Sequence, residues 1–458
     1  MKHIDIKKLF HSPEEFLEKQ VVVCGWVRTA RDSKTIAFIE LNDGTCLKNL
    51  QLIFEKEKID AEALKNAMAV GTSLRVEGAF IASEKNGYEM NVSSFEVLGE
   101  CPADYPLQKK RHTLEFLRTI PHLRVRARYF EAVFAVRDAL SHAVHGYFHK
   151  NGYKYVHAPI ITGSDCEGAG EVFRVTTHPW KTEHKSEAEY FANDFFGAKA
   201  GLTVSAQLEG EMAAMGLGRI YTFGPTFRAE HSNTTRHAAE FWQIEPEVCF
   251  AEIDDIIEIA EDFIKSIIRQ VMEECPEEMD FFNQWVEPGL KDKLNNVLSS
   301  SFGRITYTEA VDVLQKSGVE FKYPVKWGCD LQTEHEKYLT DVHFKKPVFV
   351  VDYPADIKAF YMKQNADGKT VAATDLLVPG IGEIIGCSER EWSYEKLKNA
   401  MEKRGMPLEA YGEYLETRKF GSVPHSGFGL GFDRMIMYLT GVQNIRDTLL
   451  FPRTVGSL

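Results

Sequence analysis

The sequence predicts an α+β protein in which a small β-rich domain precedes a larger domain of mixed strands and helices. Residues 20–100 read as short strands separated by turns, whereas the rest of the chain combines strands and amphipathic helices without a regular βαβ repeat. A chain of 458 residues is also longer than one compact core usually supports, so two or three domains are expected.

Residues 1–100 are predicted to form an OB-type barrel. Runs rich in β-branched and aromatic residues cover 21–27, 36–41, 50–54, 72–78 and 88–97, and a helical stretch at 59–70 follows the third run. The pairs Asp43-Gly44 and Asn86-Gly87 are typical of hairpin turns. Five strands with a helix between the third and fourth is the element order of the OB fold, whose strand face commonly binds single-stranded oligonucleotides.

Composition excludes several classes of protein. The net charge of −13 argues against nonspecific coating of nucleic acid, although a local basic patch acts over about 8–10 Å and leaves RNA binding open. No run of about 18 apolar residues and no secretory signal occur, so no membrane association is expected. The eight cysteines are scattered, which disfavours a zinc knuckle or a redox pair and fits the reducing cytoplasm.

The central part of the chain divides into a hinge and a second domain. Residues 101–124 contain three prolines and the basic cluster 109–112, and we interpret them as a linker or hinge. The second domain, 125–458, opens with a predicted helix at 125–150, whose apolar face is Val133, Val136, Leu140, Val144 and Phe148. A strand-like stretch at 153–161 follows, and its Pro159 would belong at an edge or interface. A second amphipathic helix is predicted at 253–273.

A polar loop between two strand-like runs at 226–245 carries residues suited to nucleotide binding. Arg228, Glu230, Phe241 and Glu245 could project from one antiparallel hairpin. A guanidinium can grip phosphate through two hydrogen bonds, and an aromatic ring can stack on a purine. The alternative is a solvated hairpin with surface ion pairs.

A glycine-rich run lies near the C-terminus. Gly427, Gly429 and Gly431 alternate along a predicted strand, which removes side chains from one face and lets a flat ligand approach the backbone. Arg434 opens the helix that follows and could pair with an anion. A purely structural turn is the alternative. No Gly-x-x-x-x-Gly-Lys-Ser/Thr loop occurs, so any use of ATP would not involve a P-loop.

Taken together, these segments resemble motifs 1 (about 125–161), 2 (about 221–247) and 3 (about 427–440) of the class II aminoacyl-tRNA synthetases. With the barrel in front, the resemblance narrows to the aspartyl, asparaginyl and lysyl subclass. It implies an OB-fold anticodon-binding domain, a catalytic antiparallel sheet flanked by helices, and a homodimer formed through motif 1. It also implies a two-step ligation that converts ATP to AMP and pyrophosphate with Mg²⁺.

The resemblance assigns roles at the ATP site. Arg228 would hold the α-phosphate and the substrate carboxylate, Arg434 would cover the opposite face of the nucleotide, and Phe241 would stack on adenine. The remaining ATP contacts would be Glu230, His237 and Gly431. Mg²⁺ would be held by Glu383, with Asp375 preferred over Asp367 as its assistant. Arg228, Glu383 and Arg434 would thus carry the chemistry by neutralising charge at the α-phosphorus.

The amino-acid site favours asparagine. By resemblance, Glu167 and Gln207 would contact the α-amino group, and Arg390 would contact the side chain. Aspartyl members carry a lysine three residues after the glutamine, where this chain has Gly210. The loss of that cation fits a neutral carboxamide, whose NH₂ would need an acceptor, either Glu245, which we prefer, or Glu240.

The expected reaction is therefore ligation of L-asparagine to tRNA(Asn). One alternative is an aspartyl enzyme, which could also be of the kind that charges both tRNAs. The other is a non-catalytic RNA-binding paralogue. In the barrel, the resemblance assigns Phe38 and Gln51 to the central anticodon base, with Arg28 and Arg31 near backbone phosphates; a core role for Phe38 is the alternative. Cys387 departs from the family pattern, which has glycine there, and the polar insertion 176–194 has no assigned role.

Overall fold

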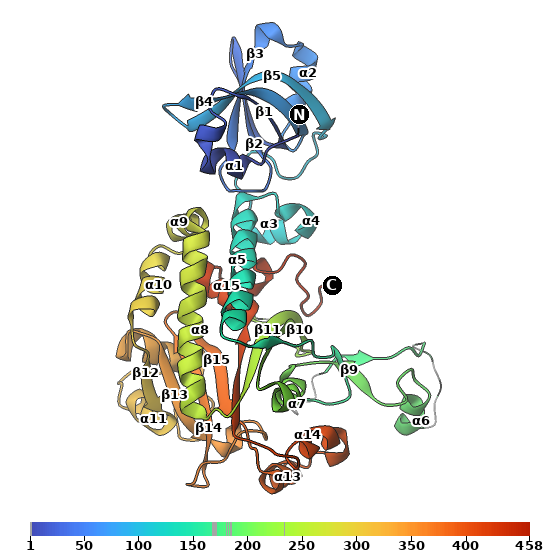
Figure 1. The fold of residues 1–458 in the computed structure, drawn as a ribbon, viewed down its shortest axis with the longest axis vertical. Helices are drawn as coiled ribbons and strands as arrows, with labels where there is room; N and C mark the ends of the chain where they lie inside the picture. Colours follow the sequence, from blue (N-terminus) through green and yellow to red (C-terminus); the bar gives the residue numbers. More distant parts are fainter. Residues whose placement is uncertain (1, 167–171, 180, 182, 184–185, 233) are drawn as a thin grey trace. The chain divides into compact units, whose positions relative to one another are not determined.

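The computed structural model describes residues 2–166, 172–179, 181, 183, 186–232 and 234–458 (Figure 1). The chain forms two compact units, Met1–Ala135 and Val136–Leu458, and the division falls within helix α5 (Arg128–Lys150). The domain boundaries predicted at residues 100 and 125 remain a prediction. Within the described ranges, no helix is long and apolar enough to cross a membrane.

The first unit contains a closed five-stranded barrel with the order β1-β2-β3-β5-β4. Its strands are β1 (Gln20–Asp32), β2 (Ile36–Asn42), β3 (Leu50–Glu55), β4 (Ser73–Ser83) and β5 (Gly87–Gly99). Helix α2 (Ala61–Ala67) lies between β3 and β4, as predicted for an OB fold, and the side chain of Asp60 caps its first turn. The other elements of this unit are α1 (Ile6–His11), η1 (Pro13–Glu15), η2 (Lys56–Lys58), α3 (Leu114–Arg118) and α4 (Pro121–Arg124).

Alternation along the strands sorts the barrel residues into a core and an outer face. On β2, Ala37, Ile39 and Leu41 are fully buried, whereas Phe38 between them is only partly buried. On β3, Leu50, Leu52 and Phe54 are fully buried and Gln51 is not. Because successive side chains of a strand point to opposite faces, Phe38 and Gln51 lie on the outside of the barrel.

The second unit is built on a sheet of eight strands with the order β12-β13-β14-β15-β16-β11-β10-β6. Only the two end pairs, β12–β13 and β10–β6, are parallel; the six strands from β13 to β10 are antiparallel to their neighbours. The bounds are β6 (Lys154–Tyr155), β10 (Arg219–Phe227), β11 (Glu240–Cys249), β12 (Gly303–Thr306), β13 (Val348–Pro354), β14 (Thr370–Val378), β15 (Gly382–Glu389) and β16 (His425–Gly431). The predicted α+β class is confirmed.

Helices α5 and α8 (Ile253–Glu274) run along this sheet (Figure 1). The ring of Phe148 on α5 lies 4.9 Å from that of Phe263 on α8, and Phe263 in turn faces Phe428 on β16. The five apolar residues predicted for one face of α5 are all buried with no exposed area, which confirms that prediction. The helix predicted at 253–273 is confirmed as well.

The other elements of the second unit complete the fold around this sheet. They are the small sheet β7-β9-β8 (Ile161–Thr162, Ala200–Leu202, Arg174–Val175), α6 (Glu187–Ala192), α7 (Gln207–Leu217), α9 (Pro276–Trp285), α10 (Leu290–Ser299), α11 (Tyr307–Gln315), α12 (Thr333–Lys337), the π-helix η3 (Tyr338–His343), η4 (Ala355–Ile357), α13 (Tyr394–Lys403), η5 (Leu408–Tyr411), α14 (Gly412–Glu416), α15 (Phe432–Thr440) and η6 (Ile445–Asp447).

The prediction of one strand over residues 153–161 is wrong. Only its two ends are strand: β6 joins the large sheet and β7 joins the small one. Between them the chain changes sheets, and Pro159, which has no N–H to donate, lies in this crossing segment. Two short strands in different sheets look like one longer strand in the sequence.

Candidate active site

A pocket of about 350 Å³ opens on the large sheet of the second unit, over strands β11, β14, β15 and β16. Most of the residues predicted for the ATP and amino-acid sites line it: Gln207, Arg228, Glu230, His237, Phe241, Glu245, Asp375, Glu383, Arg390, Gly431 and Arg434. These residues come from segments more than 200 positions apart, and the fold brings them to one cavity.

The β10–β11 hairpin supplies one wall of the pocket. Thr226 pairs with Phe241 and Phe227 with Glu240, so Arg228 follows directly after the last paired residue. Its N–H donates to the carbonyl of Ala239 at 3.0 Å, and its guanidinium lies 5.4 Å from the centre of the Phe241 ring. The hairpin therefore presents a cation and an aromatic face together to the pocket, unlike the solvated hairpin that was the alternative.

Arg434 lies on α15 and closes another side of the pocket. Its Nη1 donates to the carbonyl of Glu383 at 3.2 Å. Arg236, which the sequence analysis did not single out, also lines the pocket and donates to the carbonyl of Ile381 at 3.0 Å. Burial and the nearby charge of Arg434 lower the pKa of Arg236. Such a crowding of guanidinium groups favours a polyanionic ligand.

Glu383 and Asp375 converge on one point of the pocket. A Cβ built on Gly386 would lie 3.5 Å from Asp375 Oδ1 and 3.5 Å from Glu383 Oε1, so both carboxylates overhang this glycine. Burial and the charge of Asp375 raise the pKa of Glu383, and Lys358 Nζ lies 2.7 Å from Asp375 Oδ2. A buried and a partly buried carboxylate facing one space fit an oxygen-ligated divalent cation. Among the described residues, no group of three or more His, Cys, Asp or Glu could hold a metal ion.

The glycine-rich strand β16 serves two purposes. A Cβ on Gly427 would lie within 2.3–2.4 Å of the carboxylate atoms of Glu247, whereas one on Gly429 would meet nothing within 4 Å. Gly429 and Gly431 line the pocket. The expectation that all three glycines admit a ligand is therefore wrong for Gly427, which makes room for a protein side chain instead.

Substituting these two glycines should have opposite effects. We expect Gly427→Ala to lower the free energy of unfolding by about 1–3 kcal/mol, because the added methyl displaces a buried carboxylate. Gly429→Ala should leave stability within about 0.5 kcal/mol of the original and weaken nucleotide binding, because its methyl enters the pocket. Urea unfolding and ATP titration of both variants would measure this; equal stability of the two would contradict it.

Arg390 is held at the floor of the pocket by Glu247. Its Nε and Nη2 donate to the two carboxylate oxygens of Glu247 at 3.2 and 2.5 Å, and its Nη1 donates to Ser388 Oγ at 2.6 Å. Although burial opposes it, Glu247 and then Glu211 raise the pKa of Arg390. Burial raises the pKa of Glu247, but the two hydrogen bonds from Arg390 favour the ionised carboxylate, so the two side chains form an ion pair.

Gln207 and Glu245 lie beside this pair. The Nε2 of Gln207 donates to Glu211 Oε1 at 2.9 Å, which leaves its carbonyl oxygen as the acceptor end. Glu245 accepts from Ser205 Oγ and, at 3.0 Å, from the N–H of Ala206, and burial raises its pKa. Glu240, the alternative acceptor, is exposed and is not among the lining residues. Glu167 lies outside the described residues.

The outer face of the barrel carries three of the four residues predicted to contact an anticodon. Arg31 is paired with Phe38 across β1 and β2, and its guanidinium lies 4.7 Å from the centre of the Phe38 ring. Gln51 lies on the same face and donates to Glu89 Oε1 at 2.6 Å. The core role for Phe38, which was the alternative, does not fit its partial exposure.

Arg28 is placed differently. Its side chain is only 17% exposed, and its guanidinium pairs with Glu131 and donates to the carbonyl of Arg126 and to Asn42. Burial lowers its pKa to about 10. These partners take up both terminal nitrogens of the guanidinium, so Arg28 forms a structural ion pair in this unit, and its expected phosphate contact stays a prediction.

Comparison with known proteins places the chain in a family. A family model described as class II tRNA synthetases (D, K and N) matches residues 113–455, and one described as an OB-fold nucleic acid binding domain matches residues 21–98. The asparagine–tRNA ligase of Alkaliphilus oremlandii is 56% identical over 461 residues, covering 100% of this chain and 99% of its own. That of Clostridium kluyveri is 54% identical over 463 residues with the same coverage. The chain belongs to the asparagine–tRNA ligase family of class II tRNA synthetases.

Solved structures agree with this family. The asparaginyl-tRNA synthetase from Pyrococcus horikoshii complexed with asparaginyl-adenylate matches with a TM-score of 0.88 and 33% identity, covering 100% of this chain and 99% of its own. The Entamoeba histolytica asparaginyl-tRNA synthetase in complex with asparaginyl-adenylate matches with a TM-score of 0.82 and 28% identity, covering 96% of each chain. The OB-fold barrel and the class II catalytic sheet are thus both features of this ligase family.

The class II synthetase fold also accommodates the departure at Cys387. This residue lies on β15, only 2% exposed, between Thr374 of β14 and Phe428 of β16. Burial raises the pKa of its thiol well above the usual range, so the group is a neutral part of the pocket wall. The cysteine fits where the family pattern has glycine.

Sequence reasoning missed several polar residues of the site in this ligase. They are Arg236, Glu247 and Lys358, which line the pocket, and Glu211, which contacts Gln207. Glu247 could have been found, because it lies two positions after Glu245 on the same strand and therefore on the same face. Glu211 lies four positions after Gln207 on α7, one helical turn away, so it too had a local signal.

Proposed function

We propose that this protein ligates L-asparagine to tRNA(Asn) in two steps, through an asparaginyl-adenylate, while ATP is converted to AMP and pyrophosphate. The observation that carries the choice of asparagine is the charge balance at the floor of the pocket. Arg390 is there already paired with Glu247. A Cβ on Gly210 would touch Glu247 Cγ at 3.4 Å, so a cation at position 210 would add a second positive charge beside this pair. Without it, the floor suits a neutral carboxamide better than a carboxylate.

In the first step, a carboxylate oxygen of asparagine bonds to the α-phosphorus of ATP, and the bond from that phosphorus to the pyrophosphate oxygen breaks. Arg228 and Arg434 neutralise the negative charge that gathers on the phosphoryl oxygens. Phe241 stacks on the adenine, which fixes the nucleotide relative to the attacking oxygen. In the second step, the terminal ribose hydroxyl of the tRNA attacks the carbonyl carbon of the adenylate, and AMP leaves.

We also propose that Asp375 and Glu383 hold a magnesium ion, which would supply further neutralisation of phosphate charge when bound. At the other end of the substrate, the carbonyl of Gln207 would accept from the α-amino group. Arg390 would donate to the carboxamide oxygen and Glu245 would accept from its NH₂. Each end of asparagine thereby meets groups of matching hydrogen-bonding character, and an analogue that leaves them unpaired is rejected.

The test of this function is ATP–pyrophosphate exchange measured side by side with asparagine and aspartate. We expect strong exchange with asparagine and none above background with aspartate. Strong exchange with aspartate and none with asparagine would contradict the proposal in favour of an aspartyl enzyme. Absence of exchange with both would favour a non-catalytic protein.

Loss of the barrel aromatic should separate RNA recognition from chemistry. We expect Phe38→Ala to lower kcat/KM for tRNA(Asn) in aminoacylation by about 10- to 100-fold, because one base loses its stacking partner. Exchange, which needs no tRNA, should stay within twofold of the unaltered protein and serves as the internal control. An equal fall in both activities would contradict a role confined to tRNA.

We propose further that two copies of the chain associate through the motif 1 region. A second, largely apolar pocket of about 270 Å³ includes Tyr155, Pro159, Ile160 and Trp242 in its lining, and Tyr155 and Ile160 are 44% and 41% exposed. Strand β6, which contains Tyr155, is the last strand of the large sheet, so its outer edge is available to pair with another chain. Sedimentation should give a dimer, and Ile160→Asp should give a monomer; a monomeric unaltered protein would contradict this.

The cytoplasm is the compartment that we propose for this reaction. All eight cysteines, each in the described part of the chain, are free thiols. A reducing compartment keeps cysteines in that state.

A further inference from the structure

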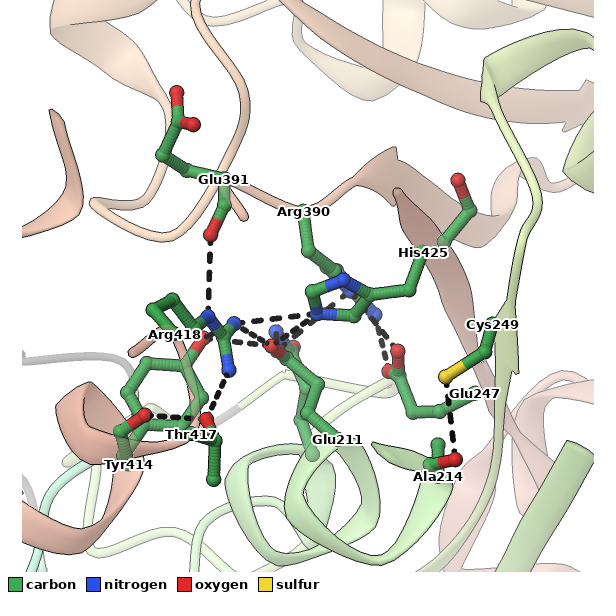
Figure 2. A network of polar contacts seen from close by, with 12 residues as sticks. Glu211, Ala214, Glu247, Cys249, Arg390, Glu391, Tyr414, Thr417, Arg418 and His425 are labelled. Carbon is green, nitrogen blue, oxygen red and sulfur yellow. Dashed lines mark hydrogen bonds and ion pairs between the residues drawn. The ribbon is translucent and has the colours of Figure 1, made fainter. Parts of the chain in front are cut away.

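A cluster of buried charged side chains contacts Arg390, which lines the pocket (Figure 2). Its centre is Glu211 on α7, whose side chain is fully buried. One carboxylate oxygen, Oε2, accepts from Arg418 Nη2, from the hydroxyl of Tyr414 at 2.7 Å, and lies 3.1 Å from His425 Nε2. These three partners are themselves buried.

The other oxygen of Glu211 contacts two residues that line the pocket. Its Oε1 accepts from Gln207 Nε2 at 2.9 Å and lies 3.7 Å from Arg390 Nε. Gln207 and Arg390 are the residues to which the proposed function gives opposite ends of asparagine, the α-amino group and the carboxamide. A single carboxylate therefore contacts the side chains that would define both ends of the substrate.

The side chain of Glu211 is ionised. Although burial opposes ionisation, Arg418, His425 and Arg390 hold the pKa of Glu211 well below its ordinary value. A group with a lowered pKa stays ionised above that value, so the carboxylate is charged at any pH at which a synthetase would be assayed. Buried ion clusters seldom stabilise a fold more than apolar residues of the same size would, so stability alone is a weak reason for this one.

His425 adds a second tie between the cluster and Arg390. Its Nδ1 lies 2.9 Å from the carbonyl of Val423, an acceptor, so Nδ1 carries a hydrogen. Its Nε2 lies 3.1 Å from Glu211 Oε2 and 3.2 Å from Arg418 Nη2. The backbone carbonyl of His425 accepts the N–H of Arg390 at 2.8 Å. The backbone of Arg390 is thus fixed by the same strand that carries this cluster member.

We propose that Glu211 is a positioning residue that sets the distance between Gln207 and Arg390, and so selects the length of the amino-acid substrate. The inference rests on the proposed function and extends it. Asparagine and glutamine have the same end groups and differ by one methylene, which a soft pocket distinguishes by only about 10- to 200-fold. A rigid carboxylate that holds Gln207 and Arg390 at a fixed separation would prevent the pocket from accommodating glutamine.

Glu211→Gln tests the proposal with little change of shape. The amide removes the charge and sets an N–H₂ against the donors of Arg418 and Tyr414 or against Gln207. We expect the KM for asparagine in exchange to rise at least tenfold, with the KM for ATP within twofold. The ratio of kcat/KM for asparagine over glutamine should fall at least tenfold. A merely structural role would lower the fraction of active protein and leave that ratio unchanged.

Glu209→Gln is the matched control. It makes the same charge change on the same helix, at a partly buried residue that contacts Thr162 and does not line the pocket. Its KM for asparagine and its asparagine-to-glutamine ratio should stay within twofold of the unaltered protein. Changes in Glu209→Gln as large as those in Glu211→Gln would overturn the positioning role.

The outcomes separate the two proposals. If the unaltered protein shows no asparagine-dependent exchange, the proposed function is overturned and this inference with it. If it shows that exchange and folded Glu211→Gln keeps the original KM and ratio, only the positioning role is overturned. Should Glu211→Gln fail to fold, Tyr414→Phe, which removes one donor, decides: we expect a two- to fivefold rise in the KM for asparagine, and no change would overturn the proposal.

Discussion

Arg434→Ala should lower asparagine-dependent ATP–pyrophosphate exchange by about 10²- to 10³-fold while the protein keeps its fold. Arg434 lines the pocket and, within the described part of the chain, donates a single hydrogen bond, to the carbonyl of Glu383. Its removal therefore leaves the surrounding packing largely intact. The transition state, by contrast, loses a positive charge at the phosphate oxygens.

The measurement is exchange at saturating ATP and asparagine, with circular dichroism as the check of the fold. Arg304→Ala is a suitable control, because Arg304 forms an exposed ion pair with Asp254 and does not line the pocket. The control should retain full exchange. Unchanged exchange in Arg434→Ala would remove this residue from the active site.

Arg390→Gln should cost both stability and activity. The substitution leaves Glu247 and Glu211 buried with one cation fewer, and breaking a buried ion pair from one side typically lowers the free energy of unfolding by about 3–5 kcal/mol. Exchange with asparagine should fall below detection, because the donor to the carboxamide oxygen is lost as well. Urea unfolding and exchange would report the two effects independently.

The double variant Arg390→Gln/Glu247→Gln distinguishes these effects. Removing the carboxylate that lost its partner should restore part of the stability, because no uncompensated charge remains at that position. Exchange should stay lost, since the carboxamide still lacks its charged donor. Recovery of exchange in the double variant would show that Arg390 acts only by neutralising Glu247.

Much of the fold could be predicted because its signals are local. The barrel strands alternate apolar and polar residues, and α5 and α8 repeat their apolar residues at the helical period. The segment 153–161 was misread because a change of sheet leaves no mark in a β-rich run except Pro159. Local patterns describe an element well, but they do not say which sheet it joins.

The site was predicted in part for the same reason. The alternation of side chains along β11 would have distinguished Glu245 from Glu240. Residues five positions apart in a regular strand point to opposite faces, so only one of the two can face the pocket. The contact between Glu211 and Arg418 joins residues 207 positions apart, so no window of the sequence contains both. Two of the partners of Arg28, Arg126 and Glu131, likewise lie about 100 positions away.

The β10–β11 hairpin has two hollows, one on each side, and Glu245 belongs to the lining of both. It acts as a shared wall, with the proposed carboxamide contact on one side and the proposed meeting surface of two copies on the other. In such a dimer, the partner presses on the reverse side of the substrate cavity. If the two copies meet there as proposed, we expect the affinity for asparagine to fall when the protein is diluted until the copies separate.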